Sequence, residues 1–432
     1  MRLPYGSDIA LPPAKRERAV VARGWIDDGP RHQGRTVTVG DSAASGVAEV
    51  AGYVLIVGGY GNVGQRIARL LAEELGGRLL VAGRDIRRAS RFAETLSGGA
   101  TARRIDIDDP ESHASALEGV VAVMMCLDTT ELAFAQACVK RGVRYIDISA
   151  SYEVIERLSF LHDLAAAQRA TIVCSVGLAP GLTNLLAKAC VKSTDTFISS
   201  IAVHLLFGLG DQHGRAALKW LVDRLHRPFA TGSNGTARQH RPFEERAQAV
   251  FPSPFGERTT YRFDFSDQHT LPQTLGVPDV STWTTYDRAA TARLLSHLAK
   301  RGVLRWTRNR VIRRLTVLLL SALRGGSDQF AVAVTATPAG EAQTLSATAT
   351  GHQEAQATAV VAAETLRRVL NTPPAPGVFQ LDELYDLGDF EATLARNGIQ
   401  VSAPTPLKRS QQAQATTRTS ADAASCNDGA RR

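Results

Sequence analysis

Short apolar segments alternate with amphipathic segments over residues 51–180. The apolar segments are rich in Val, Ile and Leu, as buried strands are. The amphipathic segments, such as IARLLAEEL at 67–75, have apolar residues at helical spacing. We expect strands at Tyr53–Val57, Arg78–Ala82, a segment ending at Ile105–Ile107, Val120–Met125, Arg144–Ile148 and Thr171–Cys174. Strands of this composition are buried on both faces, so the pattern predicts a doubly wound parallel sheet covered by helices.

The alternation stops after Pro180, and longer strands with period-2 patterning follow. The expected strands are Phe197–Phe207, Thr259–Phe265, Phe330–Thr337 and Gln343–Thr350, and the expected helices are Gly214–Leu225, Asp287–Ala299 and Leu304–Leu323. This pattern is typical of an α+β domain with an antiparallel sheet. A later helix, Glu354–Leu370, is expected to return to the first domain. The predicted fold class is therefore α/β, with a second α+β domain.

The two ends of the chain differ in composition from the middle. Residues 1–50 mix Pro, Gly, Arg and Asp without periodicity, and residues 402–432 are rich in Ser, Thr and Gln with almost no large apolar residues. Such segments cannot bury enough apolar surface to offset the entropy of ordering, so we predict a disordered leader and a disordered tail. Between them lie an expected dinucleotide domain at 51–180, a substrate and dimerisation domain at 181–350, and C-terminal helices at 351–401.

A glycine cluster directly follows the first expected strand. Gly59-Tyr60-Gly61-Asn62-Val63-Gly64 has the spacing GxGxxG and opens the first amphipathic segment. Between a buried strand and a helix, this string is the fingerprint of a Rossmann dinucleotide site. We expect Gly59 to permit the tight turn, Gly61 to let backbone amides approach a diphosphate, and Gly64 to let helix and strand pack closely. The helix N-terminus then stabilises the phosphate charge.

The end of the second strand predicts which dinucleotide binds. An acidic side chain there would hold the ribose 2′-hydroxyl, but this chain has Ala82-Gly83-Arg84. A guanidinium matches a dianionic 2′-phosphate, so the sequence predicts NADP, with NAD as the alternative. Arg87, with Arg88 and Arg91, is a second candidate, although a solvated helix face explains these three equally well. Asp85, directly after Arg84, weakens the argument for NADP.

Two further strand ends supply expected cofactor contacts. Asp106 and Ile107 end the third strand, where adenine usually lies. Cys126 and Asp128 follow the fourth strand, close to the expected nicotinamide ribose. Asp128 is equally well explained as the N-cap of the helix that begins near Thr130.

Several segments together resemble one protein family. VGGYGNVGQRIARLLAE, VAGR, CLDTTELAFAQACVKRGVRYIDISASYE and GLAPGLTNLLA resemble the saccharopine dehydrogenase-like oxidoreductases, as do GHQEAQATAVVAAETL and PGVFQLDELYDLGDFEATLARNGI near the end. The resemblance covers residues from about 50 to 400 and is loose from about 230 to 330. It implies a Rossmann domain interrupted by an α+β substrate and dimerisation domain. It also implies NAD(P)-linked reduction of imines formed between an amine and a carbonyl compound, although some members are described as enoyl reductases.

Side chains after the fifth and sixth strands are expected beneath the nicotinamide. Hydride transfer needs little from the protein beyond orientation, electrostatics and one proton donor. We place Asp147 among the catalytic candidates, and Tyr152 and Asn184 among the substrate-binding candidates. Asn184 lies in the loop Gly177–Asn184, where a helix-capping role explains it equally well.

A glycine-rich stretch, Gly208–Arg215, leaves the first strand of the second domain. His213 is the preferred proton donor, because imidazole ordinarily titrates near neutral pH. Lys219 is a further catalytic candidate, and Arg215 and Lys219 together suit a substrate carboxylate. A surface loop with ordinary charges explains the same residues. His204 lies in the middle of an expected strand and is interpreted as structural.

The formal net charge is +8, and its densest part is Lys300–Arg314, which contains no acidic residue. We interpret this segment as a solvated helix face that continues into a buried one at VLLLSAL. The alternative is a basic amphipathic helix on an anionic membrane, which would use Arg308, Arg310, Arg313 and Arg314. The segment has no nucleic-acid-binding fold or aromatic platform beside it, which argues against nucleic acid as a partner. No apolar run reaches the roughly 18 residues of a membrane span.

The five cysteines are scattered and never have a CxxC spacing. They are Cys126, Cys138, Cys174, Cys190 and Cys426. Four lie in apolar surroundings and are interpreted as reduced core residues, not as a disulfide or metal framework. This pattern predicts a cytoplasmic protein without a bound metal.

Together these observations predict an NADPH-dependent reductase that transfers hydride to a C=N bond in a small, carboxylate-bearing molecule. The resemblance adds the expectation of a homodimer. An enoyl reductase of a lipid or secondary metabolite is one alternative. A non-catalytic dinucleotide-binding sensor or scaffold is another, since the sequence contains no evident catalytic triad. The sequence leaves the substrate, the direction of the reaction and the oligomer size open.

Overall fold

The computed structural model describes residues 52–211, 215–232, 238–322, 325–340 and 343–407. The predicted leader at 1–50 lies outside these residues, as does the predicted tail from 408 onward. His213 and Cys426 also fall outside them.

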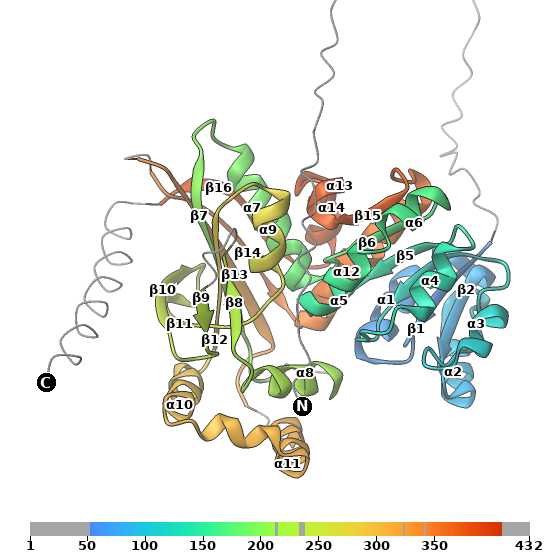
Figure 1. Ribbon diagram of the computed structural model, residues 1–432, viewed down its shortest axis with the longest axis horizontal. Coiled ribbons are helices and arrows are strands. Elements are labelled where there is room, and N and C mark those ends of the chain that lie inside the picture. Colours follow the sequence, from blue (N-terminus) through green and yellow to red (C-terminus); the bar gives the residue numbers. More distant parts are fainter. Residues whose placement is uncertain (1–51, 212–214, 233–237, 323–324, 341–342, 408–432) are drawn as a thin grey trace, which may run out of the picture. The chain divides into compact units, whose positions relative to one another are not determined.

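Six strands from residues 53–174 and one late strand form a parallel sheet (Figure 1). Its strand order is β15-β6-β5-β4-β1-β2-β3. The strands are β1 Tyr53–Val57, β2 Leu79–Gly83, β3 Thr101–Arg104, β4 Val120–Met125, β5 Arg144–Asp147, β6 Thr171–Cys174 and β15 Gly377–Gln380. Successive side chains of a strand point to opposite faces, so Val54 and Ile56 join one hydrophobic cluster while Leu55 and Val57 join another. Both faces are therefore buried, as the unbroken apolar composition predicts.

Helices cover the two faces of this sheet. They are α1 Asn62–Leu75, α2 Ile86–Ala93, α3 Pro110–Ala116, α4 Ala133–Val139, α5 Tyr152–Ser159, α6 His162–Ala167 and α12 Glu354–Asn371. The last of these returns to pack beside α1, where Arg367 Nε lies 2.7 Å from Glu74 Oε2 and Arg66 donates to Gln353 Oε1 at 2.7 Å. Helix α12 thus packs against α1, although the two helices are far apart in the sequence.

The second sheet is mixed and has the strand order β10-β11-β12-β7-β13-β14-β16. Its strands are β7 Ile198–Phe207, β10 Arg246–Phe251, β11 Gly256–Arg262, β12 Asp279–Tyr286, β13 Gln329–Pro338, β14 Leu345–His352 and β16 Gln400–Pro406. The expected antiparallel arrangement holds for all neighbours except β12 and β7, which are parallel. A separate pair, β8 Phe229–Thr231 and β9 Arg238–His240, completes the described strands.

The structure corrects two sequence-based boundaries. Residues 402–406, assigned to a disordered tail, belong to β16, which gains its order from backbone pairing with β14. The expected helix Leu304–Leu323 is two elements, η4 Val303–Arg308 and α11 Arg310–Ala322. Asn309 separates them because its backbone is extended and its side chain accepts a hydrogen bond from Val311 N at 2.8 Å, which caps α11.

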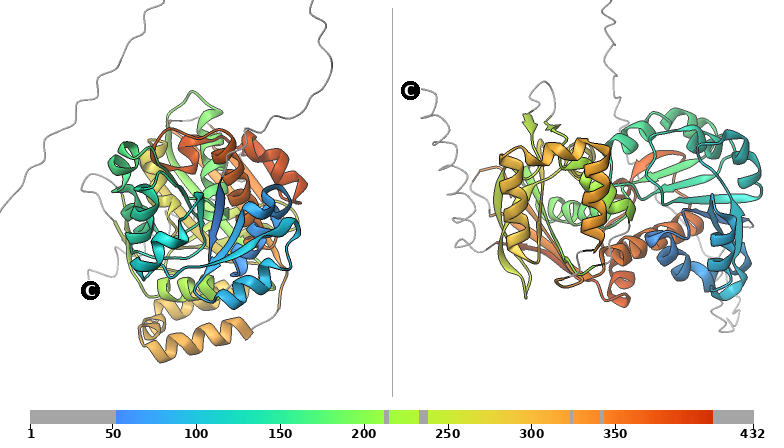
Figure 2. Two further views of the ribbon diagram at one scale, coloured as in Figure 1. Left: turned by 90° about the vertical axis from the view of Figure 1, so that its right-hand side faces the viewer. Right: turned by 90° about the horizontal axis from the view of Figure 1, so that it is seen from below.

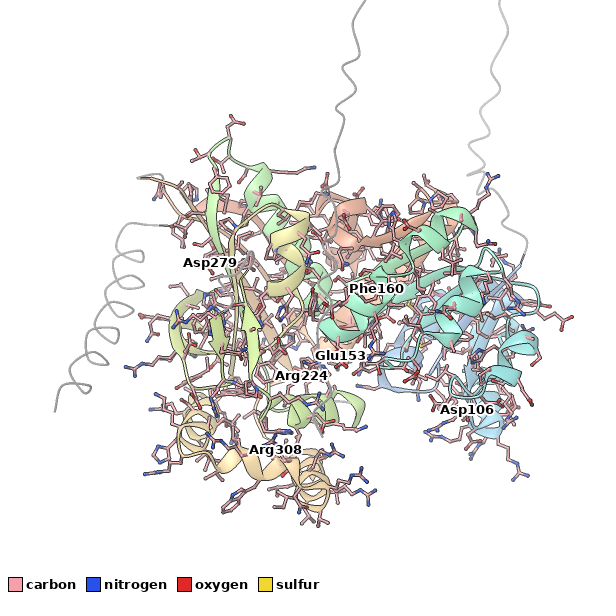
Figure 3. All side chains as sticks on the ribbon, viewed as in Figure 1. Asp106, Glu153, Phe160, Arg224, Asp279 and Arg308 are labelled. Atoms are coloured by element: carbon pink, nitrogen blue, oxygen red, sulfur yellow. The ribbon has the colours of Figure 1, made fainter. Side chains whose placement is uncertain are left out.

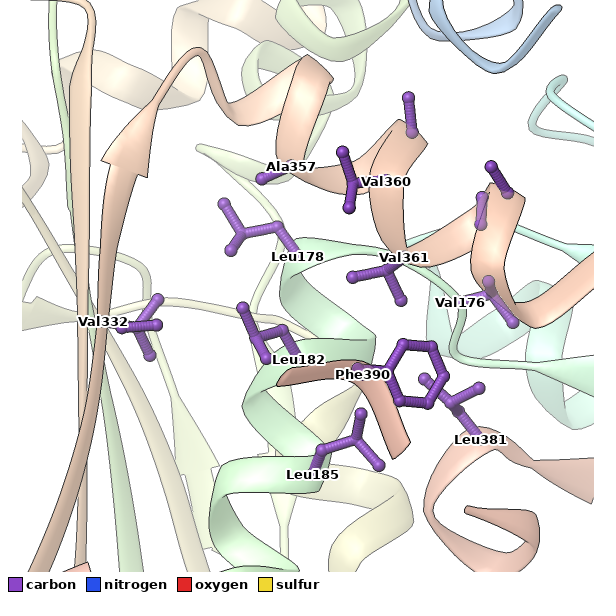
Figure 4. Close-up of a cluster of buried hydrophobic side chains, with 14 of the residues drawn as sticks. Val176, Leu178, Leu182, Leu185, Val332, Ala357, Val360, Val361, Leu381 and Phe390 are labelled. Carbon is purple, nitrogen blue, oxygen red and sulfur yellow. The ribbon is translucent and has the colours of Figure 1, made fainter. Parts of the chain in front are cut away.

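A shared apolar cluster joins the two sheets (Figure 4). Leu178 and Leu182 come from the loop η3 Leu178–Leu182, which leads from β6 into α7 Thr183–Lys192. They pack with Val332 of β13 and with Val361 of α12. The remaining helices are α8 Arg215–Arg224, α9 Asp267–Thr274, α10 Ala289–Lys300, α13 Leu381–Leu384 and α14 Gly388–Arg396. Because this core is continuous, the carboxyl end of the parallel sheet has a fixed relation to the elements that follow β6.

Candidate active site

The glycine loop closes tightly over the carboxyl end of β1. The amides of Gly58 and Gly59 both donate to the carbonyl oxygen of Ala82, at 2.9 and 3.1 Å, and Gly61 N donates to Gly58 O at 2.8 Å. The residue in the left-handed region is Gly58, with φ +76°. The expected turn therefore exists, but its conformational demand falls on Gly58, one residue before the predicted Gly59.

Close backbone contacts exclude a side chain at three glycines of this loop. A Cβ on Gly64 would lie 2.4 Å from Gly58 O, one on Gly59 2.8 Å from Ile56 O, and one on Gly61 3.0 Å from Gly58 O. Helix α1 begins at Asn62, followed by Val63, with no side-chain cap at Gly61 and no acidic residue in its first turn. A helix start with exposed backbone and no competing carboxylate suits a phosphate group, so the cradle fits the diphosphate of a dinucleotide.

Tyr60 and Arg88 form a platform at the end of β2. A Cβ on Gly83 would lie 2.5 Å from the Tyr60 ring, and the Tyr60 hydroxyl accepts a hydrogen bond from Asp85 N at 3.1 Å. The Arg88 guanidinium lies 4.9 Å from the centre of the same ring. This is a cation–π contact that leaves the guanidinium edge able to bind an anion.

An open hollow of about 320 Å³ lies beside this platform. Its lining consists of Tyr60, Gln65, Arg88, Arg91 and Phe92. The predicted Arg84 and Arg87 are exposed but do not line it. Arg88 and Arg91, which the sequence explained equally well as a solvated face, are therefore the arginines that face the hollow.

The side chains expected at the ends of β3 and β4 have local partners. Asp106 accepts a hydrogen bond from Asp108 N at 3.3 Å, and the Ile107 carbonyl is 3.1 Å from His113 Nε2. Cys126 is half-buried, and burial raises the pKa of its thiol above the ordinary range. Asp128 does not cap the following helix, because α4 begins only at Ala133 with Leu132 at its N-cap. Asp128 instead accepts a hydrogen bond from Ser149 Oγ at 2.7 Å.

Asp147 lies at the end of β5 and is 1% exposed. Its Oδ1 accepts a hydrogen bond from Ser149 N at 2.8 Å. Burial, together with the nearby charge of Asp128, raises its pKa from the ordinary value of 3.8 to about 7, although the hydrogen bond from Ser149 N acts in the opposite direction. The predicted Asp147 is therefore a buried side chain that holds the turn at Ser149.

A polar cluster at the start of α5 contains three residues that sequence analysis missed. The Tyr152 ring stacks on His269 with ring centres 4.5 Å apart, and His269 Nε2 is 2.8 Å from Asp264 Oδ1. Arg224 bridges from α8, with Nη1 2.8 Å from Asp264 Oδ2 and Nη2 donating to Ser151 Oγ at 2.6 Å (Figure 3). We call Tyr152, Arg224, Asp264 and His269 the polar cluster.

The cluster brings side chains from distant segments to the carboxyl end of β5. In α/β sheets this end is where ligands bind, and β1 and β4, which begin the two halves of the sheet, are neighbours. One oxygen of Asp264 accepts a hydrogen bond from the Arg224 guanidinium, and the other lies against Nε2 of His269. No local pattern in the sequence marks this pair, because Asp264 lies in the loop after β11 and His269 lies within α9.

The other predicted site residues lie elsewhere. Asn184 is fully buried, where its Oδ1 accepts from Gly181 N at 3.2 Å and its Nδ2 donates to Asp382 at 3.0 Å, so it supports the loop instead of facing substrate. Lys219 is exposed on α8. Arg215 begins that helix, but its side chain, like His213, lies outside the described residues. His204 is buried with Nδ1 3.0 Å from Thr260 Oγ1, and burial lowers its pKa to about 3, which confirms the structural interpretation.

Comparison with known proteins identifies the first domain. Residues 54–173 match the family model described as the saccharopine dehydrogenase NADP binding domain. No curated protein sequence matches the chain. The fold is similar to that of apo, histidine-tagged saccharopine dehydrogenase (L-Glu forming) from Saccharomyces cerevisiae, with a TM-score of 0.57 and 13% identity over 82% of this chain and 100% of that one. The family-model match confirms both the predicted resemblance and NADP as the cofactor of this domain.

Two other solved structures match with lower scores. The amine dehydrogenase from Mycobacterium smegmatis has a TM-score of 0.37 and 12% identity, over 79% of this chain and 98% of that one. The DAP dehydrogenase from C. glutamicum, in complex with DAP, has a TM-score of 0.36 and 14% identity over the same shares. These scores are too low to inform on the fold of this chain. In the described residues, no helix is both long and apolar enough to cross a membrane, and Cys126, Cys138, Cys174 and Cys190 are free thiols.

Proposed function

We propose that this chain, an NAD(P)-dependent oxidoreductase with an NADP-binding domain of the saccharopine dehydrogenase type, reduces C=N bonds formed between an amine and a carbonyl compound. The observation that carries the proposal is the polar cluster at the carboxyl end of β5. It holds an imidazole against a carboxylate, 2.8 Å apart, beside the start of α5. The second domain thus brings an imidazole and a carboxylate to the edge of the NADP-binding domain where we expect the nicotinamide ring.

Reduction of an imine requires one hydride and one proton. Bound NADPH supplies the hydride to the carbon, and the nitrogen takes the proton from the protein. His269 is the proposed donor, because imidazole is the side chain that ordinarily exchanges protons near neutral pH and Asp264 holds its Nε2 in place at 2.8 Å. His269 takes the place that the sequence analysis gave to His213.

Arg224 and Tyr152 are proposed to position the donor. Arg224 fixes Asp264 through one nitrogen and Ser151 through another, so the carboxylate and the start of α5 move together. Tyr152 stacks on the imidazole with an angle of 19° between the ring planes, which sets the direction in which Nδ1 points. Orientation of this kind is what a hydride-transfer site needs from its protein.

Several finer predictions remain part of the proposal. We expect Lys219 to attract a substrate carboxylate from the exposed side of α8. We expect a homodimer in the cytoplasm, and a binding role for Asp106, Ile107, Cys126 and Asp128 along the cofactor. The proposed contacts of these residues are tested by measuring the binding of cofactor and substrate.

The test is oxidation of NADPH by the full chain in the presence of paired amines and 2-keto acids. We expect a secondary amine whose mass equals amine plus keto acid, less water and plus two hydrogens. Turnover of enoyl thioesters with no turnover of any amine–carbonyl pair would transfer the assignment to C=C reduction. Binding of NADPH without turnover of either class would favour a sensor or scaffold.

A further inference from the structure

Helix α11 presents an apolar face to solvent. Val311, Leu315, Leu318 and Leu319 are 65%, 60%, 53% and 62% exposed. At about 100° per residue they lie on one side of the helix, with the spacing i, i+4, i+7 and i+8. The expectation that VLLLSAL is buried is therefore wrong for Leu318 and Leu319.

A different side of α11 attaches the helix to its own chain. Arg313 Nη1 lies 3.0 Å from Asp223 Oδ1 of α8, and Val317 and Leu320 pack against the main core. Because these contacts already hold the helix, the exposed leucines are not needed to anchor it. An exposed apolar patch of this kind marks a surface for another partner.

Basic residues border the apolar face. Lys300, Arg301, Arg305, Arg308, Arg310 and Arg314 are all exposed, and residues 288–322 contain no Asp or Glu. The same segment exposes two more large apolar side chains, Trp306 in η4 (66%) and Leu294 in α10 (58%). The view from below in Figure 2 shows α10, η4 and α11 as an outer layer over the end of the second sheet, and Figure 3 labels Arg308 within it. We call residues 294–319 of this layer the basic apolar surface.

We propose that the basic apolar surface docks this protein onto an anionic lipid surface. The arginines would contact lipid phosphates, while Trp306 and the leucines of α11 would enter the boundary between headgroups and acyl chains. With its 13 residues α11 lies along the interface and does not span the bilayer. The proposal does not depend on which bond the enzyme reduces.

Charge decides between lipid and a second copy of the chain. In a two-fold contact the surface would meet itself, so Arg308, Arg310 and Arg314 would face the same arginines without a carboxylate in the segment to neutralise them. An anionic membrane supplies the opposite charge along the whole surface. Lipid phosphates also match the guanidinium geometry.

The test is co-sedimentation of the full chain with vesicles of phosphatidylcholine alone or mixed with phosphatidylglycerol. We expect at least about tenfold more binding to the anionic vesicles, and weakening as salt is raised. Arg310→Glu with Arg314→Glu should abolish this preference. Leu315→Ser with Leu319→Ser should lower binding to anionic vesicles at least about fivefold, because the apolar part of the contact is lost.

The matched controls change exposed residues of the first domain. Lys140→Glu with Arg141→Glu makes the same change in net charge on exposed residues after α4, and Phe160→Ser removes a lone apolar side chain that is 76% exposed. Both should bind vesicles as the unmodified protein does. Equal loss of binding in the control pair would overturn the proposal, since net charge alone would then explain it.

A second measurement does not depend on the folding of the leucine variants. Lipids with brominated acyl chains should quench the tryptophan fluorescence of the unmodified chain, and Trp306→Phe should remove most of the quenching. No quenching, or unchanged quenching in Trp306→Phe, contradicts insertion of this surface. If the protein ignores anionic vesicles and the leucine pair converts a dimer into a monomer, the surface is a subunit interface and the lipid proposal is wrong.

Discussion

The two ends of the candidate active site are built from different parts of the chain. At the end of β1 the site consists largely of backbone, because a Cβ on Gly59, Gly61 or Gly64 would come within 3.0 Å of a backbone oxygen. At the end of β5 it consists of side chains from α5, α8, α9 and the loop before α9. The first end presents amides fixed by the turn itself. The second presents charges that hold one another in place.

This difference predicts how each end fails. A backbone cradle tolerates any change that adds no atoms to it, and it has no protonation state of its own. The polar cluster depends on every partner, because removing one leaves a buried or half-buried charge without compensation. We therefore expect substitutions at the glycine loop to alter cofactor binding, and substitutions in the polar cluster to alter turnover and its pH dependence.

The largest effect is expected at His269. His269→Gln should lower kcat by about 10²- to 10⁴-fold, the usual contribution of a positioned proton donor, while NADPH affinity changes less than about twofold. Stopped-flow oxidation and NADPH fluorescence titration measure the two quantities. His297→Gln, at an exposed histidine of α10, is the matched control. Equal loss of affinity and turnover in the His269 variant would place this residue at the cofactor and not at the proton.

Asp147 is expected to give the next largest effect, through pH. Its pKa is about 7 in the folded chain and near 3.8 when unfolded, so the unfolded chain loses the proton first. The contribution of Asp147 to folding stability should be greatest below about pH 4 and fall by roughly 4 kcal/mol as the pH rises to about 7. Asp147→Asn keeps the acceptor for Ser149 N and should remove this slope. Urea unfolding across that pH range checks it, with the exposed Asp163→Asn as a control whose slope stays that of the unmodified protein.

The glycine loop is expected to respond mainly in cofactor binding. Gly61→Asp places a carboxylate at the start of α1, where it competes with the diphosphate, and should weaken NADPH binding by about a hundredfold, or about 2.7 kcal/mol. The thermal midpoint of the free protein should also fall, because a Cβ at this position would lie 3.0 Å from Gly58 O. Gly388→Asp is a matched control, because Gly388 also begins a helix and has open space around it. Unaltered NADPH affinity in Gly61→Asp would remove the loop from the cofactor site.

Much of the first end follows from local sequence. The strand YVLIV, the glycine spacing and the amphipathic helix that follows each specify structure within a few residues, so their positions agree closely with β1 and α1. Gly58 was missed because the fingerprint starts one residue later. Arg87 and Arg88 are adjacent on α2 and point in different directions around the helix. Which of them faces the hollow is evident only from the three-dimensional structure, in which Arg88 contacts the Tyr60 ring.

The second end depends on contacts between segments far apart in the chain. His269 meets Tyr152 and Asp264 meets Arg224 only when the two sheets share a core, and no local pattern marks those pairs. His213 was preferred because imidazole titrates near neutral pH and because it lies in a glycine-rich stretch, and neither feature identifies a partner side chain. Strand β15 was missed for the same reason, since its four residues gain their order by pairing with β6, which lies about 200 positions earlier.

The smallest predicted effect tests whether the backbone end also relies on one side chain. Arg88→Ala should lower the preference for NADPH over NADH by about tenfold, because the guanidinium on the Tyr60 ring is the charge that faces the hollow at the end of β2. Arg87→Ala removes an equal charge from the same helix but does not line the hollow, so its preference should shift less than about twofold. The ratio of kcat/KM for the two cofactors measures both. If Arg87→Ala has the larger effect, the 2′-phosphate binds on the outer face of α2, and the sequence-based choice of Arg84 and Arg87 is the correct one.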